Sequence, residues 1–392
     1  MTNQRDLHTR NLPHWMQWTS SALVATAGLL AAIPARSAEA PLPTPQTRPL
    51  HWFQRNGETK PCYDRNRLSH LPVTDLHLHA QPFGGKSIPH PTLMAFLKAL
   101  EVRFALLYGI GQTLPYNSPC TYYLNCIGTE AKPSLKNDFE NAANLIEYPQ
   151  SDLHVALSMT FPDLTEPEAI PAKIALLDEE YPGLFRWMGE VNLHKEALRG
   201  NGHRPATKAE IDRWQSFMPI LRKRKIPLAL HADLGHNDAP EEHRHLIDHA
   251  LKRYPHNTIV WMHMGLSREL TTMDVDRHIA VMEEYLQRYP NLYLDLSWTV
   301  LSEAYFSDPS KRRRYVAFIN RHPKRLIAGT DFVAAANKDF ATYRKEAEVT
   351  GGIFAEINDE AFRQIVLGQT YFALMPGMAE QFEAPPVCPA VP

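Results

Sequence analysis

Six side chains that can ligate a divalent metal stand at or near the ends of apolar runs. They are imidazoles and carboxylates, which hold zinc in proteins, and they lie in the segments TDLHLH, MGEVNL, LALHAD, WMHMG and AGTDF as His77, His79, Glu190, His231, His263 and Asp331. A divalent cation bound by such groups lowers the pKa of a coordinated water from 15.7 to about 7. Brought together by the fold, these residues predict a metal-dependent hydrolase.

The first two histidines share one strand-like segment, VTDLHLH. Alternate side chains of a strand point the same way, so His77 and His79 should face one site together. A His-x-His pair alone is weak, because a chain of 392 residues with 19 histidines contains one by chance about once. We interpret a second pair, His243 and His245 in the polar run EEHRHLIDHA, as a solvated helix surface, since i and i+2 point apart on a helix.

The chain alternates between strand-like and helix-like patterns. Apolar runs suited to buried parallel strands lie at 73–79, 102–110, 154–161, 185–193, 226–232, 258–264, 292–298 and 326–331. Amphipathic segments between them include 136–148, 167–181, 208–224, 241–254, 274–289 and 311–321. This order predicts a (β/α)8 TIM barrel with an N-terminal extension and a long loop after the second strand. A doubly wound open sheet is the alternative, but no GxGxxG follows these runs.

The N-terminus has the pattern of an export signal. Arg5 and Arg10 precede an apolar stretch at 22–33, which is shorter than the roughly 20 residues needed to span a bilayer. We therefore expect a cleaved secretory signal, no stable membrane anchor and a periplasmic or secreted protein; an uncleaved membrane-proximal helix is the alternative. The predicted divisions are signal peptide 1–38, linker and extension 39–71, barrel 72–376 and C-terminal tail 377–392.

Four cysteines fit an oxidising compartment, because an even number can pair as disulfides. We expect Cys120 to pair with Cys126 across a short loop, which leaves Cys62 to tie the extension to Cys388 in the tail. Four free or buried thiols are the alternative.

The charge balance restricts the partners. With 41 basic and 43 acidic residues, a formal charge of −2, the chain lacks the broad cationic face that nucleic acid requires. We expect a small-molecule substrate, and the sequence leaves open whether the chain forms a homo-oligomer.

Residues that contact substrate should lie in the loops that follow the strands, where barrel active sites are built. Candidates are Arg268, Asp295 and Trp298, with Lys195 in addition, and each has a purely structural alternative. The insertion at 111–133 carries tyrosines and two cysteines, and we interpret it as a disulfide-stapled lid or a packed surface excursion.

The ordered ligand set resembles the amidohydrolase superfamily, and most closely its amidohydrolase-2 branch, over residues 72–376. The resemblance implies a centre of one or two divalent ions, usually zinc, with Asp331 as both metal ligand and proton carrier. Many two-metal members use a carboxylated lysine on the fourth strand, whereas this chain has Glu190, similar to TatD-type deoxyribonucleases. Glu190 could therefore bridge two ions or hydrogen-bond beside one.

A mechanism follows from this ligand set. Asp331 would accept the proton of the activated water, and His263 could donate a hydrogen bond to the developing oxyanion. Asp75 is either a partner that orients His77 or a structural group in the barrel wall. We expect hydrolysis of an ester, lactone, amide or related bond, with a metal-dependent decarboxylase as the alternative and a catalytically idle binding barrel as a third reading.

Overall fold

The computed structural model describes residues 61–65, 70–375 and 382–389. The predicted signal peptide and most of the predicted linker lie outside these residues. Among the helices of the described part, none has the length and apolar character needed to cross a bilayer.

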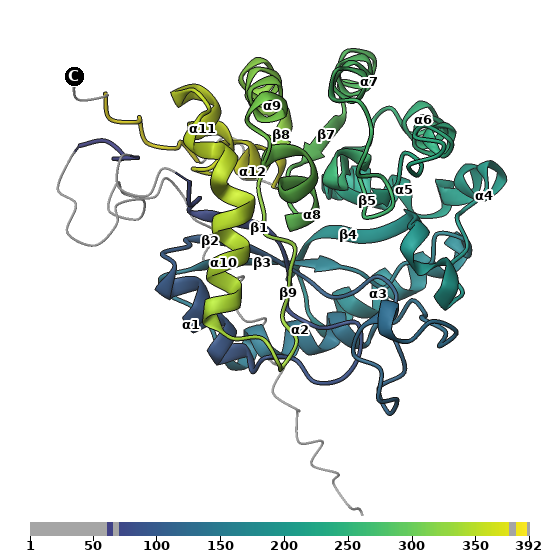
Figure 1. Ribbon diagram of the computed structural model, residues 1–392. Coiled ribbons are helices and arrows are strands. Elements are labelled where there is room, and N and C mark those ends of the chain that lie inside the picture. The colour runs from purple at the N-terminus through teal and green to yellow at the C-terminus, as the bar shows by residue number, and fades with distance from the viewer. Residues whose placement is uncertain (1–60, 66–69, 376–381, 390–392) are drawn as a thin grey trace, which may run out of the picture. The chain divides into compact units, whose positions relative to one another are not determined.

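Nine parallel strands form a curled sheet with helices around its outside (Figure 1). Their order in the sheet is β8-β7-β6-β5-β4-β3-β2-β1-β9, so β1 to β8 follow one another in sequence order and β9 lies beside β1. The strands are β1 (Thr74–His79), β2 (Phe104–Tyr108), β3 (His154–Met159), β4 (Phe185–His194), β5 (Leu228–Ala232), β6 (Ile259–Trp261), β7 (Leu292–Asp295), β8 (Leu326–Ile327) and β9 (Phe332–Val333). This arrangement matches the predicted α/β barrel and excludes the doubly wound alternative, in which the strand order would reverse at a switch point.

Twelve α-helices are assigned within the described residues. They are α1 (His90–Ala99), α2 (Lys136–Glu147), α3 (Ile170–Glu180), α4 (Lys208–Arg213), α5 (Met218–Arg224), α6 (Arg244–Arg253), α7 (Val275–Arg288), α8 (Thr299–Leu301), α9 (Pro309–Arg321), α10 (Phe340–Gly351), α11 (Asp359–Ile365) and α12 (Gln369–Leu374). The single helix predicted over 208–224 is wrong, because a 3-10 turn at Trp214–Ser216 separates α4 from α5. Pro219 lies in the first turn of α5, and without an amide hydrogen it could not continue a preceding helix.

The eighth strand, predicted as one run at 326–331, is divided. Its first part, β8, pairs with β7, and its second part, β9, pairs with β1. Between them, Ala328 accepts a hydrogen bond from the Leu76 amide (3.0 Å), and the Asp331 amide donates to the His77 carbonyl (2.7 Å). The divided strand therefore links β7 to β1 and closes the barrel, with Asp331 at the interruption.

Both predicted disulfides are present. Cys62 pairs with Cys388, and backbone hydrogen bonds between Tyr63 and residues 386 and 388 join the same two segments. Cys120 pairs with Cys126 inside the insertion after β2. There Tyr123 packs edge-on against Phe83, in a small apolar cluster separate from the main core. Part of the insertion is thus packed, as in the packed-excursion interpretation, while Tyr116 and Ile127 are exposed.

Gly329 makes the barrel closure sterically sensitive. A Cβ atom at this position would lie 2.5 Å from the His77 amide nitrogen and 2.6 Å from its Cβ. These are backbone and near-backbone atoms, which cannot rotate away. We expect Gly329→Ala to push the divided strand off β1, to lower the free energy of unfolding by about 1–3 kcal/mol, and to reduce the metal content. Denaturant unfolding and elemental analysis would measure both, with Gly352→Ala as control because a Cβ there meets nothing within 4 Å. Equal behaviour of the two variants would contradict this view of the closure.

Candidate metal centre

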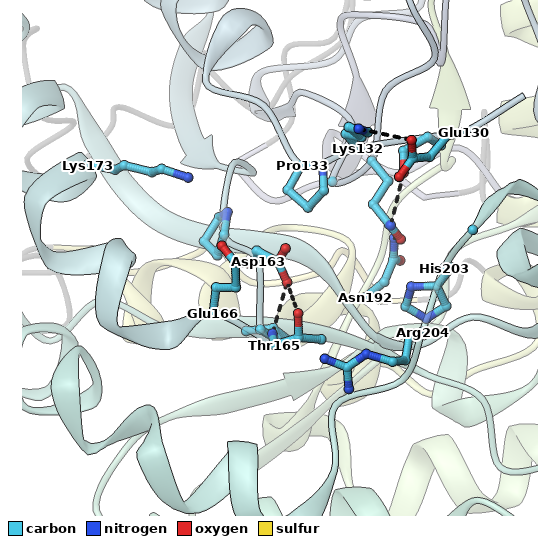
Figure 2. A pocket seen from close by; sticks show the side chains of 16 residues that line it. Glu130, Lys132, Pro133, Asp163, Thr165, Glu166, Lys173, Asn192, His203 and Arg204 are labelled. Carbon is cyan, nitrogen blue, oxygen red and sulfur yellow. Dashed lines mark hydrogen bonds and ion pairs between the residues drawn. The ribbon is translucent and has the colours of Figure 1, made fainter.

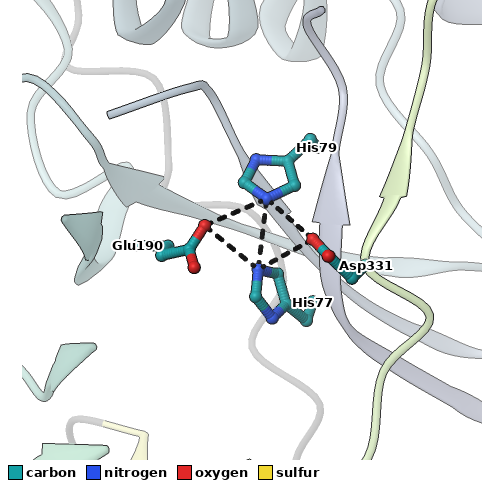
Figure 3. A group of neighbouring side chains, drawn as sticks. All are labelled: His77, His79, Glu190 and Asp331. Carbon is teal, nitrogen blue, oxygen red and sulfur yellow. Dashed lines mark hydrogen bonds and ion pairs between the residues drawn. The ribbon is translucent and has the colours of Figure 1, made fainter. Parts of the chain in front are cut away.

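The first group of ligand atoms comes from β1, β4 and the interruption between β8 and β9 (Figure 3). The Nε2 atoms of His77 and His79 lie 3.2 Å apart. Oδ1 of Asp331 lies 3.4 Å from His77 Nε2 and 3.1 Å from His79 Nε2. Oε2 of Glu190 lies 3.8 and 3.4 Å from the same two nitrogens. These four residues can surround one ion.

The second group shares Glu190 with the first. Its other oxygen, Oε1, lies 2.5 Å from Nδ1 of His231 and 3.3 Å from Nε2 of His263. Glu190, His231 and His263 form a further set whose ligand atoms are mutually within 4.8 Å. Each oxygen of the Glu190 carboxylate therefore faces a different group of imidazoles.

The ring nitrogen of each histidine that points away from Glu190 has a protein partner. His79 Nδ1 donates to the Gly109 carbonyl, and His231 Nε2 donates to Oδ1 of Asp233 at 2.9 Å. His77 Nδ1 donates to Ser297 Oγ at 2.8 Å, and the Ser297 hydroxyl in turn donates to Asp295 at 2.5 Å. Such outer partners fix the tautomer and leave the opposite nitrogen as a metal-binding lone pair.

His263 completes this pattern. Its Nδ1 lies 3.3 Å from the Ser297 carbonyl. Its Nε2 is buried and has no hydrogen-bond partner within the described residues. A buried imidazole nitrogen without a partner costs free energy unless something binds it. A metal ion between the Glu190 carboxylate and this nitrogen fits that requirement.

The electrostatics of the site also suit a cation. Burial would raise the pKa of Glu190, but the Lys195 cation and the His231 imidazole outweigh it and hold that pKa well below its usual value. Burial likewise opposes ionisation of Asp331, yet His77 and His79 lower its pKa. In return the charge on Asp331 raises the pKa of His77 well above normal, against the effect of burial. The carboxylates thus require positive charge, which a divalent ion would supply while using the ring nitrogens as ligands.

Two ligands occupy left-handed backbone conformations that non-glycine residues rarely adopt. His263 has φ 54°, followed by Met264 at 53°, and Asp331 has φ 58°. His278 on α7 supports the first, because its Nε2 donates to the Met264 carbonyl (3.0 Å) while Tyr315 donates its hydroxyl to Nδ1 (2.8 Å). Sequence reasoning missed this role of His278, which has no motif.

Asp75 supports the second conformation. Its carboxylate accepts hydrogen bonds from the Thr330 amide at 2.9 Å and the Thr330 hydroxyl at 2.8 Å, and from Tyr343 at 3.1 Å. Asp75 therefore fixes the residue beside Asp331 and makes no direct bond to His77. This corresponds to the structural alternative for Asp75.

The predicted substrate-contact residues lie in different surroundings. Asp295 is fully buried behind His77, so it lies on the side of the imidazole away from the barrel mouth. Trp298 is partly exposed, with its ring 4.8 Å from that of His263, and the exposed Arg268 lies over it at 5.8 Å. Lys195 is buried with Nζ 3.5 Å from His231 Nδ1. Trp298 and Lys195 lie beside histidines of the second group, and Arg268 lies over the Trp298 ring.

Asp233 was missed from the sequence. It follows His231 by two residues, so strand alternation places the two side chains on one side. The sequence HAD could therefore have predicted Asp233 as a hydrogen-bond partner of His231, once His231 was taken as a metal ligand whose second ring nitrogen needs an acceptor.

A polar pocket of about 360 Å³ lies beside this centre (Figure 2). It is formed by the loops after β2, β3 and β4, and the residues that line it include Lys132, Asp163, Asn192, His203 and Arg204. None of the six metal-site residues lines it. Asn192 stands two residues after Glu190 on β4, so the pocket adjoins the strand that carries the shared carboxylate. The pocket is therefore separate from the six candidate ligands and approaches them only along β4.

The fold and the ligand arrangement define an enzyme of the metal-dependent hydrolase class. The chain belongs to the amidohydrolase family, which its sequence matches over residues 139–367, and the predicted family is thereby confirmed. No curated protein matches the sequence.

Solved structures with similar folds are distant in sequence. A zinc-bound amidohydrolase from Burkholderia multivorans is 14% identical, with 76% of this chain and 96% of that chain covered and a TM-score of 0.46. An uncharacterised TIM-barrel protein from Bordetella bronchiseptica is 17% identical, with 75% and 95% covered and a TM-score of 0.44. Dihydroorotase from Campylobacter jejuni is 13% identical, with 74% and 82% covered and a TM-score of 0.42.

The buried His278 should make stability depend on pH. Burial lowers its pKa from 6.5 to about 4. In the unfolded chain His278 is therefore protonated below about pH 6.5, whereas in the folded chain it is protonated only below about pH 4. The free energy of unfolding falls as the pH drops through this window. Between pH 7 and 5 the loss is about 2 kcal/mol. His278→Gln should be less stable at pH 7 but should lose about that much less on acidification. Denaturant unfolding of both proteins after chelation would measure this, and parallel pH profiles would refute it.

Proposed function

We propose that this protein is a metal-dependent hydrolase whose centre would hold two divalent ions, with Glu190 shared between the two groups of ligands. The observation that carries the proposal is the division of the Glu190 oxygens between His77, His79 and Asp331 on one side and His231 and His263 on the other. When bound, divalent ions acidify a coordinated water and polarise the scissile oxygen. Zinc is the favoured metal, since the ligands are imidazoles and carboxylates.

Asp331 is proposed to carry the proton. Burial opposes ionisation of Asp331, but His77 and His79 lower its pKa, so the carboxylate is in its ionised form at neutral pH. Its side chain retains 12% exposure, whereas that of His77 has none, so Asp331 reaches the open end of the site. The proton would then pass from this carboxylate to the leaving group.

Lys195 is proposed to bind the substrate's polarised oxygen. His263 Nε2 points at Glu190, so this nitrogen would serve as a metal ligand. The expected role of His263 as a hydrogen-bond donor to the oxyanion is therefore assigned to Lys195. Lys195 Nζ lies 3.5 Å from His231 Nδ1, beside the second group of ligands. A buried ammonium group there stabilises a developing negative charge more strongly than it would in water.

We propose a small-molecule ester, lactone, amide or related bond as the substrate, with a decarboxylation as the second candidate. The second is favoured by two cations near the mouth, Lys195 and Arg268, which suit a substrate carboxylate. Measurement of carbon dioxide release from aromatic carboxylic acids, beside hydrolysis of an ester, lactone and amide panel, separates the two.

We further propose that the protein acts in the periplasm or outside the cell. Two disulfides support an oxidising compartment, and the predicted signal at 1–38 supplies the route. Fractionation of cells expressing the full chain would test this, and retention of the protein in the cytoplasm would oppose it.

Loss of a first-group ligand should remove bound metal. We expect His77→Ala to lose at least one equivalent relative to the wild type, because His77 faces both Asp331 and Glu190. Elemental analysis of the purified proteins would measure the loss, with the exposed His256→Ala as control. Wild-type metal content in His77→Ala would refute the assignment.

Removal of the proton carrier should abolish turnover while the fold persists. We expect Asp331→Asn to lower kcat by about 10²–10⁴-fold at saturating metal, the usual range for general acid–base catalysis. Circular dichroism would check folding, and the best substrate of the panel would report kcat. A kcat within tenfold of the wild type would exclude Asp331 from proton transfer.

A further inference from the structure

A third cluster of ligand-type side chains lies outside the metal centre. It comprises His194 at the end of β4, Glu196 at the start of a 3-10 helix (Glu196–Asn201), and His243 immediately before α6. One ligand atom from each lies within 4.8 Å of one from each of the others. The cluster therefore joins two segments that are separate in the sequence, the end of β4 with the turn after it and the start of α6.

We propose that His194, Glu196 and His243 form an auxiliary divalent-metal site, of the zinc class, that is distinct from the hydrolytic centre. Oε2 of Glu196 lies 2.9 Å from Nε2 of His194 and 3.5 Å from Nε2 of His243. Ligands bound tetrahedrally at zinc–nitrogen and zinc–oxygen distances near 2.1 Å are about 3.4 Å apart. The observed separations bracket this value. Two histidines and one glutamate, with water in a fourth position, are an established zinc ligand set.

The polar atoms of the cluster are not satisfied by the protein alone. The side chain of His243 is only 10% exposed, and its Nε2 is buried without a hydrogen-bond partner in the described part of the chain. This result overturns our sequence interpretation of His243 as solvated surface, although His245 is indeed exposed. Burial of an imidazole nitrogen without a hydrogen bond costs free energy. A cation bound between this nitrogen and the Glu196 carboxylate would remove that cost.

Ion binding requires one small movement. The rings of His194 and His243 are tilted by 30° with centroids 3.8 Å apart, whereas the rings that share the hydrolytic centre lie 5.0–5.2 Å apart. The His243 ring must therefore move away from the His194 ring. It can do so because it precedes the helix and keeps one edge near solvent. Glu196 also contacts the exposed Arg199 at 3.2 and 3.3 Å, and this flexible partner can be displaced.

The auxiliary site is connected to the hydrolytic centre through Asp233. One oxygen of Asp233 accepts the amide hydrogen of Glu196 at 2.7 Å, and the other accepts from His231 at 2.9 Å. An ion at the cluster would hold Glu196 against the start of α6 and so steady the carboxylate that orients His231. Its role is to stiffen this side of the barrel mouth, and it takes no part in the reaction.

Metal counting on the intact protein tests the proposal. Purified mature protein is loaded with Zn²⁺, freed of excess, and analysed for zinc per chain. We expect His243→Ala to hold one equivalent fewer than the wild type, and Glu196→Gln to behave likewise. In competition with a chromophoric chelator, the affinity of that one equivalent should fall by more than about 10–100-fold, the loss that follows removal of even an outer-shell partner. The matched control is His245→Ala, an exposed histidine two residues away.

The outcomes are distinct from those for the hydrolytic centre. Loss of one equivalent in His243→Ala, with the full complement in His245→Ala and turnover within about twofold of the wild type, supports the auxiliary site. The full complement in His243→Ala, or an equal loss in His245→Ala, overturns it. If circular dichroism shows His243→Ala to be unfolded, Glu196→Gln decides by the same criterion. A failure of His77→Ala to lose metal would bear on the hydrolytic centre alone.

Discussion

Buried carboxylates at the mouth of the barrel can remain ionised only beside positive charge, and the arrangement of the site follows from this constraint. Glu190 is 5% exposed, and Asp233 beside it is buried as well. An isolated carboxylate in such surroundings would neutralise itself by taking up a proton. The Lys195 ammonium offsets this cost, and the imidazoles on both sides of Glu190 offer lone pairs to a cation when they are neutral.

The closure of the barrel brings the carboxylates and imidazoles of the site close together. The divided eighth strand pairs with β7 on one side and β1 on the other, and its interruption places Asp331 against His77 and His79. Asp75 fixes the preceding Thr330, and His278 fixes the turn that carries His263. Both supports are fully buried and act on backbone atoms. The site is thus positioned by hydrogen bonds to strand ends as much as by the ligands themselves.

The barrel fold and most of the metal ligands could be predicted from the sequence, because the order and spacing of the apolar runs indicate the strands and their topology. His77 and His79 are alternate residues of one strand, so their side chains share a face. Each remaining ligand lies at or near the end of a predicted strand. Once the barrel was predicted, all six side chains could therefore be expected at one end of it. The interruption of the strand at Asp331 could not be predicted. The left-handed conformation of Asp331 depends on the neighbouring Thr330, which is held by Asp75 from the distant strand β1. The burial of His243 was missed for the same reason: its polar neighbours indicate a surface, but His194 covers it from β4.

The bridging role of Glu190 is the central claim. Anomalous diffraction from crystals of the zinc-loaded protein would test it most directly. The account predicts two peaks about 3.5–4 Å apart, with one Glu190 oxygen on each ion, His77, His79 and Asp331 on the first and His231 and His263 on the second. A single peak, or two peaks with Glu190 turned away from both, would contradict it.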